Sequence, residues 1–195
     1  NIQHRAVRFL PSFWRRRAQN PMFQAPAPKL EFGQLHDLLD ISKGNVFLPW
    51  NAHSGAQSAV IYFPGCGSGL FYPSIALSAI YSLLEAGYAV VLPQEHQCCG
   101  YPLLSAGCTE TFEKNMTRVT SSMRHLVQQA EENGSHVEAL LTSCGTCRAA
   151  LENYDLENEV DSKLVMQDIF QFLSPYLNDK IIPASSEDEK VVLHS

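Results

Sequence analysis

The spacing of five cysteines constrains this 195-residue chain more than any other feature of the sequence. Cys66 stands alone, Cys98 and Cys99 are adjacent, and Cys144 and Cys147 form a Cys-x2-Cys motif, so the pattern is Cys-x31-Cys-Cys-x44-Cys-x2-Cys. Thiolates are soft ligands that select zinc or iron–sulfur clusters, and four ligands satisfy a tetrahedral zinc ion. Five cysteines exceed that number, and adjacent cysteines reach two irons of a cluster more easily than one small ion. The pattern therefore favours an iron–sulfur cluster and leaves zinc as the alternative.

Disulfide bonding is the other common role of six cysteines, and the sequence argues against it. Adjacent cysteines rarely pair with each other, and nothing in the chain resembles a signal peptide. A hydrophobic content of 45% also provides a core that needs no covalent links. The sixth cysteine, Cys108, lies outside the pattern, and we interpret it as a nearby residue rather than a ligand.

Apolar runs and helical periodicity alternate along the chain from Ser58 onward. Continuous apolar runs at 59–63, 89–92 and 137–141 predict buried strands. Periodic apolar residues after each run predict helices, and a last helix is expected around residues 169–173, ending before Pro175. This alternation is typical of an α/β fold, so we predict a Rossmann-like parallel sheet with crossover helices, preceded by an extended proline-rich arm.

Each cysteine group directly follows one predicted strand. The carboxyl ends of parallel strands meet at one edge of a sheet, where open α/β sheets place their sites, so the fold and the spacing independently predict one site.

Several neighbours of the cysteines are candidate contributors to that site. The glycines Gly67, Gly100 and Gly145 would let the backbone approach a cluster and offer N–H donors to its sulfurs. His96 is a candidate proton donor, or a residue of a solvated loop. Arg148 would offset the negative charge of a thiolate cluster, or lie on a helix surface without a role.

The cysteine pattern resembles the cysteine-rich CCG domain family. This family occurs in heterodisulfide reductase and in iron–sulfur subunits of glycolate oxidase, anaerobic glycerol-3-phosphate dehydrogenase and lactate-utilisation enzymes, including the C-terminal iron–sulfur module of FAD-linked oxidases. The resemblance covers about residues 58–154 and is carried by the adjacent cysteine pair with Gly100 and by the Cys-x2-Cys motif. It implies a [4Fe–4S] cluster, cubane or non-cubane, whose ligands would be Cys66, Cys98, Cys99, Cys144 and Cys147.

The resemblance also implies a function. The domain would transfer electrons within a larger flavin-linked oxidoreductase of the glycolate or lactate oxidase type or the heterodisulfide reductase type. FAD would lie in a partner domain or subunit, because no flavin site is recognisable here, and a ferredoxin-type iron–sulfur domain is an expected neighbour. A quinone or a membrane partner is a further expectation. Two alternatives stay open: a zinc-holding structural or interaction module, and a catalytic cluster that reduces a disulfide.

Composition excludes some classes of protein. The net charge of −6 argues against a nucleic-acid partner. No apolar run approaches the ~20 residues of a membrane span. We therefore expect a cytoplasmic location, with peripheral attachment to the inner face of the membrane as an option.

We divide the chain into three parts. Residues 1–57 are predicted to be an extended arm or linker with one short helix at 35–39, residues 58–183 the cysteine-rich domain, and residues 184–195 a linker. The apolar residues 191–193 would form either the opening strand of a second half-module or a terminal strand that completes the sheet of this domain. We expect the chain to be a part of an oxidoreductase that does not oxidise a substrate by itself.

Overall fold

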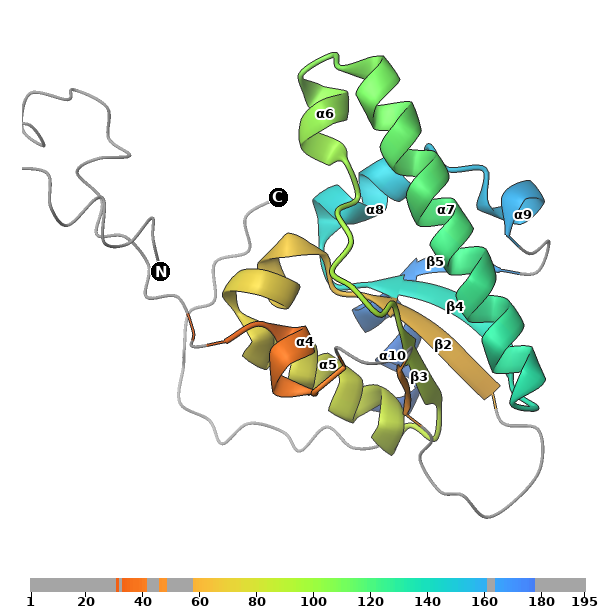
Figure 1. Cartoon of the computed structure of the whole chain (residues 1–195). Coiled ribbons are helices and arrows are strands. Elements are labelled where there is room, and N and C mark those ends of the chain that lie inside the picture. The colour runs from red at the N-terminus through yellow and green to blue at the C-terminus, as the bar shows by residue number, and fades with distance from the viewer. Residues whose placement is uncertain (1–30, 32, 42–45, 49–57, 161–163, 178–195) are drawn as a thin grey trace, which may run out of the picture.

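The computed structural model of the chain describes residues 31, 33–41, 46–48, 58–160 and 164–177 (Figure 1). In these residues a five-stranded sheet forms with the strand order β1-β3-β2-β4-β5. The strands are β1 (Val46–Leu48), β2 (Ser58–Phe63), β3 (Ala89–Leu92), β4 (His136–Thr142) and β5 (Val165–Asp168). The predicted parallel sheet is confirmed for β3, β2, β4 and β5, while β1 pairs antiparallel with β3 at one edge.

Helices connect the strands much as the periodicity predicts. The helical elements are α4 (Leu35–Leu38), the π-helix η1 (Gly67–Phe71), α5 (Pro73–Glu85), α6 (Tyr101–Ser105), α7 (Thr109–Glu132), α8 (Gly145–Leu151), α9 (Leu156–Glu159) and α10 (Ile169–Leu177). The prediction that the last helix ends before Pro175 is wrong, because α10 continues through this residue. Pro175 removes one backbone hydrogen bond, to the carbonyl of Gln171, and the exposure of both residues lets water replace it.

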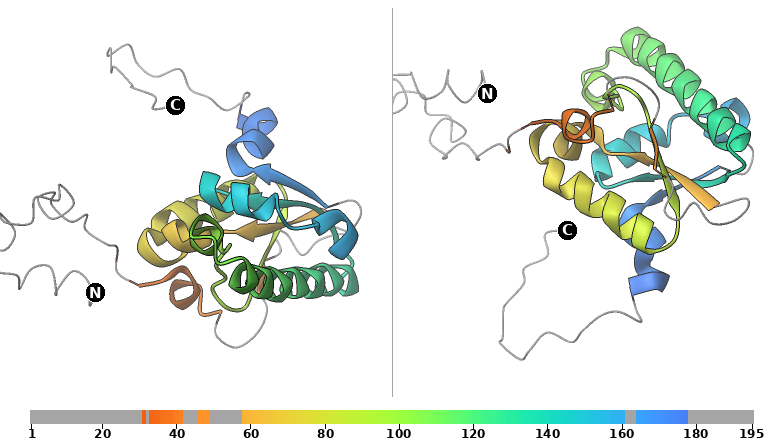
Figure 2. Two further views of the ribbon diagram at one scale, coloured as in Figure 1. Left: turned by 90° about the horizontal axis from the view of Figure 1, so that it is seen from above. Right: turned by 60° about the horizontal axis from the view of Figure 1, so that its bottom comes forward.

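Helices cover both faces of the sheet, which forms the middle of three layers (Figure 2). On one face, which we call the α7 face, α7, α8 and α9 surround a core that includes Ile61, Met123 and Leu140. On the other, the α5 face, α4, α5 and α10 surround a core that includes Leu83 and Leu141. Because both faces are covered, β2 and β3 are buried along nearly their whole length, which explains their uninterrupted apolar sequences.

The segment 31–41 belongs to the α5-face layer. Leu35 and Ile41 are buried in its core. The Glu31 carboxylate accepts hydrogen bonds from the Ser74 backbone N–H (2.8 Å) and hydroxyl at the start of α5, and these bonds lower the pKa of Glu31. The predicted short helix is present as α4. Residues 1–30 of the predicted arm and the strand expected at 191–193 lie outside the described residues.

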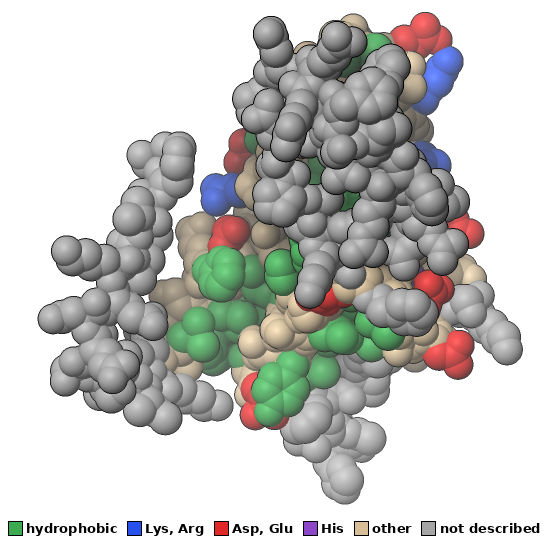
Figure 3. Space-filling view, turned by 90° about the vertical axis from the view of Figure 1, so that its left-hand side faces the viewer, with side chains coloured by type: hydrophobic (Ala, Val, Ile, Leu, Met, Phe, Trp, Pro, Cys, Tyr) green, Lys and Arg blue, Asp and Glu red, His purple; other side chains and the backbone are tan. Residues whose placement is uncertain are grey.

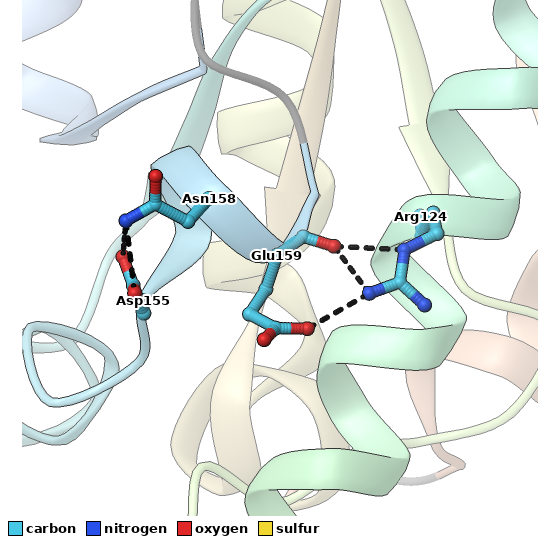
Figure 4. Close-up of polar contacts among 4 residues, drawn as sticks. All are labelled: Arg124, Asp155, Asn158 and Glu159. Carbon is cyan, nitrogen blue, oxygen red and sulfur yellow. Dashed lines mark hydrogen bonds and ion pairs between the residues drawn. The ribbon is translucent and has the colours of Figure 1, made fainter.

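An exposed ion pair fastens α9 to α7 (Figure 4). The Arg124 guanidinium donates through Nε to the Glu159 carbonyl (2.7 Å) and through Nη2 to the Glu159 carboxylate (3.0 Å). Asn158 donates to the carboxylate of Asp155 (2.8 Å), the residue just before α9. These bonds position the short α9 over the α7-face core, near Leu156.

No helix in the described part of the chain is long and apolar enough to cross a membrane.

Candidate metal centre

The cysteine groups lie in the loops that follow β2, β3 and β4, at the carboxyl edge of the parallel strands, as predicted. Cys66 precedes η1, the pair Cys98 and Cys99 precedes α6, Cys144 is the N-cap of α8, and Cys147 lies within α8. The neighbouring strands β2 and β4 lead to helices on opposite faces of the sheet, α5 and α8. Their loops therefore diverge at a topological switch point, where doubly wound sheets bind their ligands.

The five thiols contact one another across these loops. Each thiol lies close enough to another thiol for the two to shift each other's pKa, and these pairs link Cys66 to Cys98, Cys98 to Cys99, Cys99 to Cys147, and Cys147 to Cys144. All the cysteines lie in described residues, and none of them forms a disulfide. The sulfurs thus form one connected set that spans the loops after β2, β3 and β4.

Crowding shifts the acidity of these thiols. Burial, and then the neighbouring Cys98, raises the pKa of Cys66 to about 11. The hydrogen bond from the Cys147 thiol lowers the pKa of Cys99 to about 6, and the same bond, followed by burial, raises the pKa of Cys147. A first thiolate is therefore stabilised by its neighbours, and each further thiolate is opposed by the charge already present. Deprotonating the whole set therefore requires a compensating positive charge.

Steric contacts explain why glycine occupies positions 65 and 100. Gly65 has a φ of +66°, and a Cβ there would lie 2.6 Å from the Cys147 sulfur. Gly100 has a φ of +75°, and a Cβ there would lie 2.9 Å from the Asn115 amide nitrogen. At Gly67 and Gly145, a Cβ would meet nothing within 4 Å. Close backbone approach within the protein thus explains the first two glycines and not the other two.

A buried polar chain, which the sequence did not reveal, joins two of the cysteine loops. The Ser68 hydroxyl donates to the Pro64 carbonyl (2.9 Å) and contacts the Ser143 hydroxyl (3.0 Å), which in turn contacts the Tyr62 hydroxyl (2.9 Å). Ser68 follows Cys66, and Ser143 precedes Cys144. These hydrogen bonds therefore hold the loop of Cys66 and the loop of Cys144 at a fixed separation.

The predicted candidate His96 lies beside the thiols. A second histidine, His36 in the α4 segment, lies next to it and was not predicted. His96 Nε2 is 3.6 Å from the Cys66 sulfur, and burial lowers the pKa of His96, which favours the neutral ring. His36 lies edge-on to it, with ring centroids 6.4 Å apart, and His36 Nε2 is hydrogen-bonded to the Pro93 carbonyl (2.9 Å). Only the fold brings His36 here, because 60 positions separate the two histidines in the sequence.

The remaining candidates, Arg148 and Cys108, have partners outside the thiol set. The Arg148 guanidinium forms an ion pair with Glu152 one turn along α8 (3.2 Å), so a carboxylate already compensates its charge. Cys108 is exposed at the start of α7, and its backbone N–H donates to the Leu103 carbonyl (2.9 Å). Within the described residues, no group of three or more His, Cys, Asp or Glu side chains is arranged to hold a single metal ion.

Comparisons with known proteins agree with this geometry. The cysteine-rich domain family CCG matches residues 60–152. One subunit of the anaerobic glycerol-3-phosphate dehydrogenase of Escherichia coli is 27% identical over 160 residues, which cover 76% of this chain and 39% of that protein. An uncharacterized iron–sulfur protein of Methanococcus maripaludis is 30% identical over 96 residues, which cover 48% of this chain and 17% of that protein.

The chain thus spans about two fifths of the length of the dehydrogenase subunit that it matches. No solved structure matches the chain significantly. The family match begins inside β2 and ends just after α8, so it encloses the thiol set and the strands that position it. The part of the chain that matches the cysteine-rich CCG domain family is thus the part that carries the five thiols.

Proposed function

We propose that this domain holds an iron–sulfur cluster and carries electrons within a larger dehydrogenase. The observation that carries the proposal is the connected set of five thiols at the switch point of the sheet. This donor set exceeds the four ligands of a structural zinc ion and suits a cluster with several irons. When bound, such a cluster accepts and releases single electrons. The name of the matched iron–sulfur protein and that of the dehydrogenase subunit support the same conclusion.

The ligands that we propose are Cys66, Cys98, Cys99, Cys144 and Cys147, and the cluster is of the [4Fe–4S] type, cubane or non-cubane. The protein contributes the burial of Cys99 and Cys147, the hydrogen-bonded loops after β2 and β4, and an N–H donor to sulfur. Cys108 is not a ligand in this proposal, because its side chain is exposed beyond α6.

A domain that relays electrons needs one partner that supplies them and another that receives them. An FAD-containing dehydrogenase domain or subunit would supply the electrons, in an enzyme of the glycolate, lactate or glycerol-3-phosphate type. A ferredoxin-type iron–sulfur domain, a quinone or a disulfide would receive them. The enzyme would act in the cytoplasm or on the inner face of the membrane.

A surface beside the site supports contact with another protein. Figure 3 shows hydrophobic side chains gathered over the lower part of the face drawn there, on the side of η1 and α5. The exposed large hydrophobic residues of these two elements are Phe71, Ile75 and Tyr81. η1 follows Cys66 directly, so a partner bound to this surface would lie near the proposed cluster.

Serine substitution of each cysteine tests the ligand assignment. After anaerobic iron–sulfur reconstitution, each Cys→Ser variant of the five proposed ligands should bind less iron or give an altered electron paramagnetic resonance (EPR) spectrum. The matched control, Cys108→Ser, should retain the iron content and spectrum of the wild type. Loss of iron from Cys108→Ser, together with full iron content in Cys66→Ser, would contradict the assignment.

A further inference from the structure

Side chains from outside the thiol set hold both backbone carbonyls of the adjacent cysteine pair. Asn115 of α7 donates Nδ2 to the Cys98 carbonyl (2.9 Å), and Tyr154, which follows α8, donates its hydroxyl to the Cys99 carbonyl (3.1 Å). Asn115 Nδ2 also donates to the Tyr154 hydroxyl (3.3 Å), and Arg118 donates to Asn115 Oδ1 (3.2 Å). These partners fix the orientation of the Asn115 amide, because the carbonyl needs a donor and the guanidinium needs an acceptor.

The opposite ends of the same two peptide units face sulfur. In a planar trans peptide, the carbonyl and the N–H of the next residue point in opposite directions. The Cys98 carbonyl shares its peptide with the Cys99 N–H, which lies beside the Cys99 thiol and helps to lower its pKa. The Cys99 carbonyl shares its peptide with the Gly100 N–H, which donates to the Cys98 sulfur (3.4 Å). Each peptide is therefore held at its carbonyl end, and its N–H end lies beside a sulfur.

The surroundings make this arrangement rigid. Tyr154 is 5% exposed, and its ring lies edge-on to Phe112, with the ring centroids 6.1 Å apart. Phe112 and Asn115 together fill the space that a side chain at position 100 would occupy. A tyrosine hydroxyl keeps its proton at neutral pH, so Tyr154 remains a donor to the Cys99 carbonyl. In so buried a place, a fixed dipole acts strongly on a nearby charge.

We propose that Asn115 and Tyr154 are positioning residues that aim two peptide N–H groups at the ligand sulfurs and thereby raise the reduction potential of the bound cluster. This inference rests on the proposed function. Hydrogen bonds to sulfur stabilise the more negative, reduced state of an iron–sulfur cluster and shift its potential upward. The Arg118 charge at the far end of the network polarises each bond in the same direction.

The first test is Tyr154→Phe, which removes one hydroxyl and keeps the ring. Its matched control is Tyr88→Phe, which removes the hydroxyl of a buried tyrosine on the α5 face that is hydrogen-bonded to Tyr176 instead. In anaerobically reconstituted full chain, Tyr154→Phe should retain the iron content, lower the reduction potential and alter the EPR spectrum. The control should leave the potential and the spectrum unchanged.

A second variant tests the network as a unit. Asn115→Leu removes both amide donors at similar side-chain volume and should lower the potential further than Tyr154→Phe. Because Asn115 also donates to the Tyr154 hydroxyl, the shift in the double variant should be smaller than the sum of the two single shifts.

Hydrogen–deuterium exchange of the metal-free chain gives a readout that needs no cluster. Exchange at the Cys99 and Gly100 amides should be faster in Tyr154→Phe than in the wild type or in Tyr88→Phe. An unchanged potential in iron-loaded Tyr154→Phe, or unchanged exchange where that variant loses its iron, overturns the positioning role and leaves the proposed function intact. A wild-type chain that binds no iron after reconstitution overturns the proposed function itself.

Discussion

Each face of the sheet has its own hydrophobic core, and the two cores differ in their relation to the thiols. On the α7 face, Cys99 and Cys147 are members of the core, together with Phe112 of α7 and Leu151 of α8. Among the described residues of the α5-face core there is no cysteine, and this face reaches the site through the loop that carries Cys66. The candidate centre is thus a continuation of the α7-face core. Damage to the α7 face should therefore affect folding and cluster binding together, and damage to the α5 face should mainly affect folding.

The largest expected effect comes from Gly65→Ala. The positive φ costs about 1–2 kcal/mol for an alanine, and overpacking against the Cys147 sulfur costs about 1–3 kcal/mol more. This variant should lose about 2–5 kcal/mol of stability in urea denaturation and should bind little iron.

The control for this substitution is Gly87→Ala, at the end of α5. Gly87 also has a positive φ (+92°), but a Cβ there meets nothing within 4 Å. It should lose about 1–2 kcal/mol through backbone strain alone and retain its iron. Equal iron loss in both variants would show that general destabilisation, and not contact with Cys147, controls cluster binding.

A matched pair of core leucines sharpens the comparison between the faces. Leu151 on the α7 face and Leu83 on the α5 face are both 0% exposed. Replacing either with alanine should cost about 2–5 kcal/mol of stability, measured by urea denaturation. Only Leu151→Ala should also reduce iron content or change the EPR spectrum, because Leu151 lies one turn after Cys147 on α8. The same spectral change in Leu83→Ala would show that the two faces do not differ in their effect on the cluster.

Local sequence patterns were sufficient for the parallel strands β2, β3 and β4 and for the helices α5, α7 and α8, but they did not predict η1 and α6 beside the cysteines. The apolar runs of β2, β3 and β4 are uninterrupted because both faces of these strands are covered, and the parallel order then places the cysteines at one edge. Strand β5 was not predicted, since its residues are exposed or half-buried at the sheet edge and show no such run. The three-residue β1 is too short to stand out within the predicted arm.

The parts of the site that were missed depend on contacts between distant segments. His36, Asn115 and Tyr154 lie outside the cysteine motifs. Asn115 is a half-buried polar residue on the apolar side of α7, three residues after Phe112 and four before Val119, and this placement was a signal that the sequence offered. Its partner, the Cys98 carbonyl, becomes visible only in the fold.

A smaller effect is expected from Arg124→Ala, on the surface of the α7 face. The side chains of Arg124 and Glu159 are 44% and 59% exposed, so solvent screens their interaction. We expect a loss of about 0.2–1 kcal/mol in thermal or urea denaturation, with unchanged iron content. A loss of iron in this variant would show that the position of α9 matters to the site, contrary to this account.

The smallest effect is expected at Glu31, on the α5 face. Hydrogen bonds from Ser74 lower the pKa of this carboxyl in the folded chain, so its stabilising contribution is present above about pH 4.5 and is lost as the pH falls through the lower folded-state value. Glu31→Gln should therefore be slightly less stable than the wild type at about pH 6, and the difference should vanish once the pH lies below the lowered folded-state pKa of Glu31. A stability difference that persists at the acid end would point to a role other than its charge.

The central claim is that the five thiols hold a cluster of several irons, and its most direct test is the iron and acid-labile sulfide content of the chain after anaerobic reconstitution. We expect a brown protein with about four irons and about four sulfides per chain. A colourless chain that binds one zinc ion and no sulfide under the same conditions would contradict it.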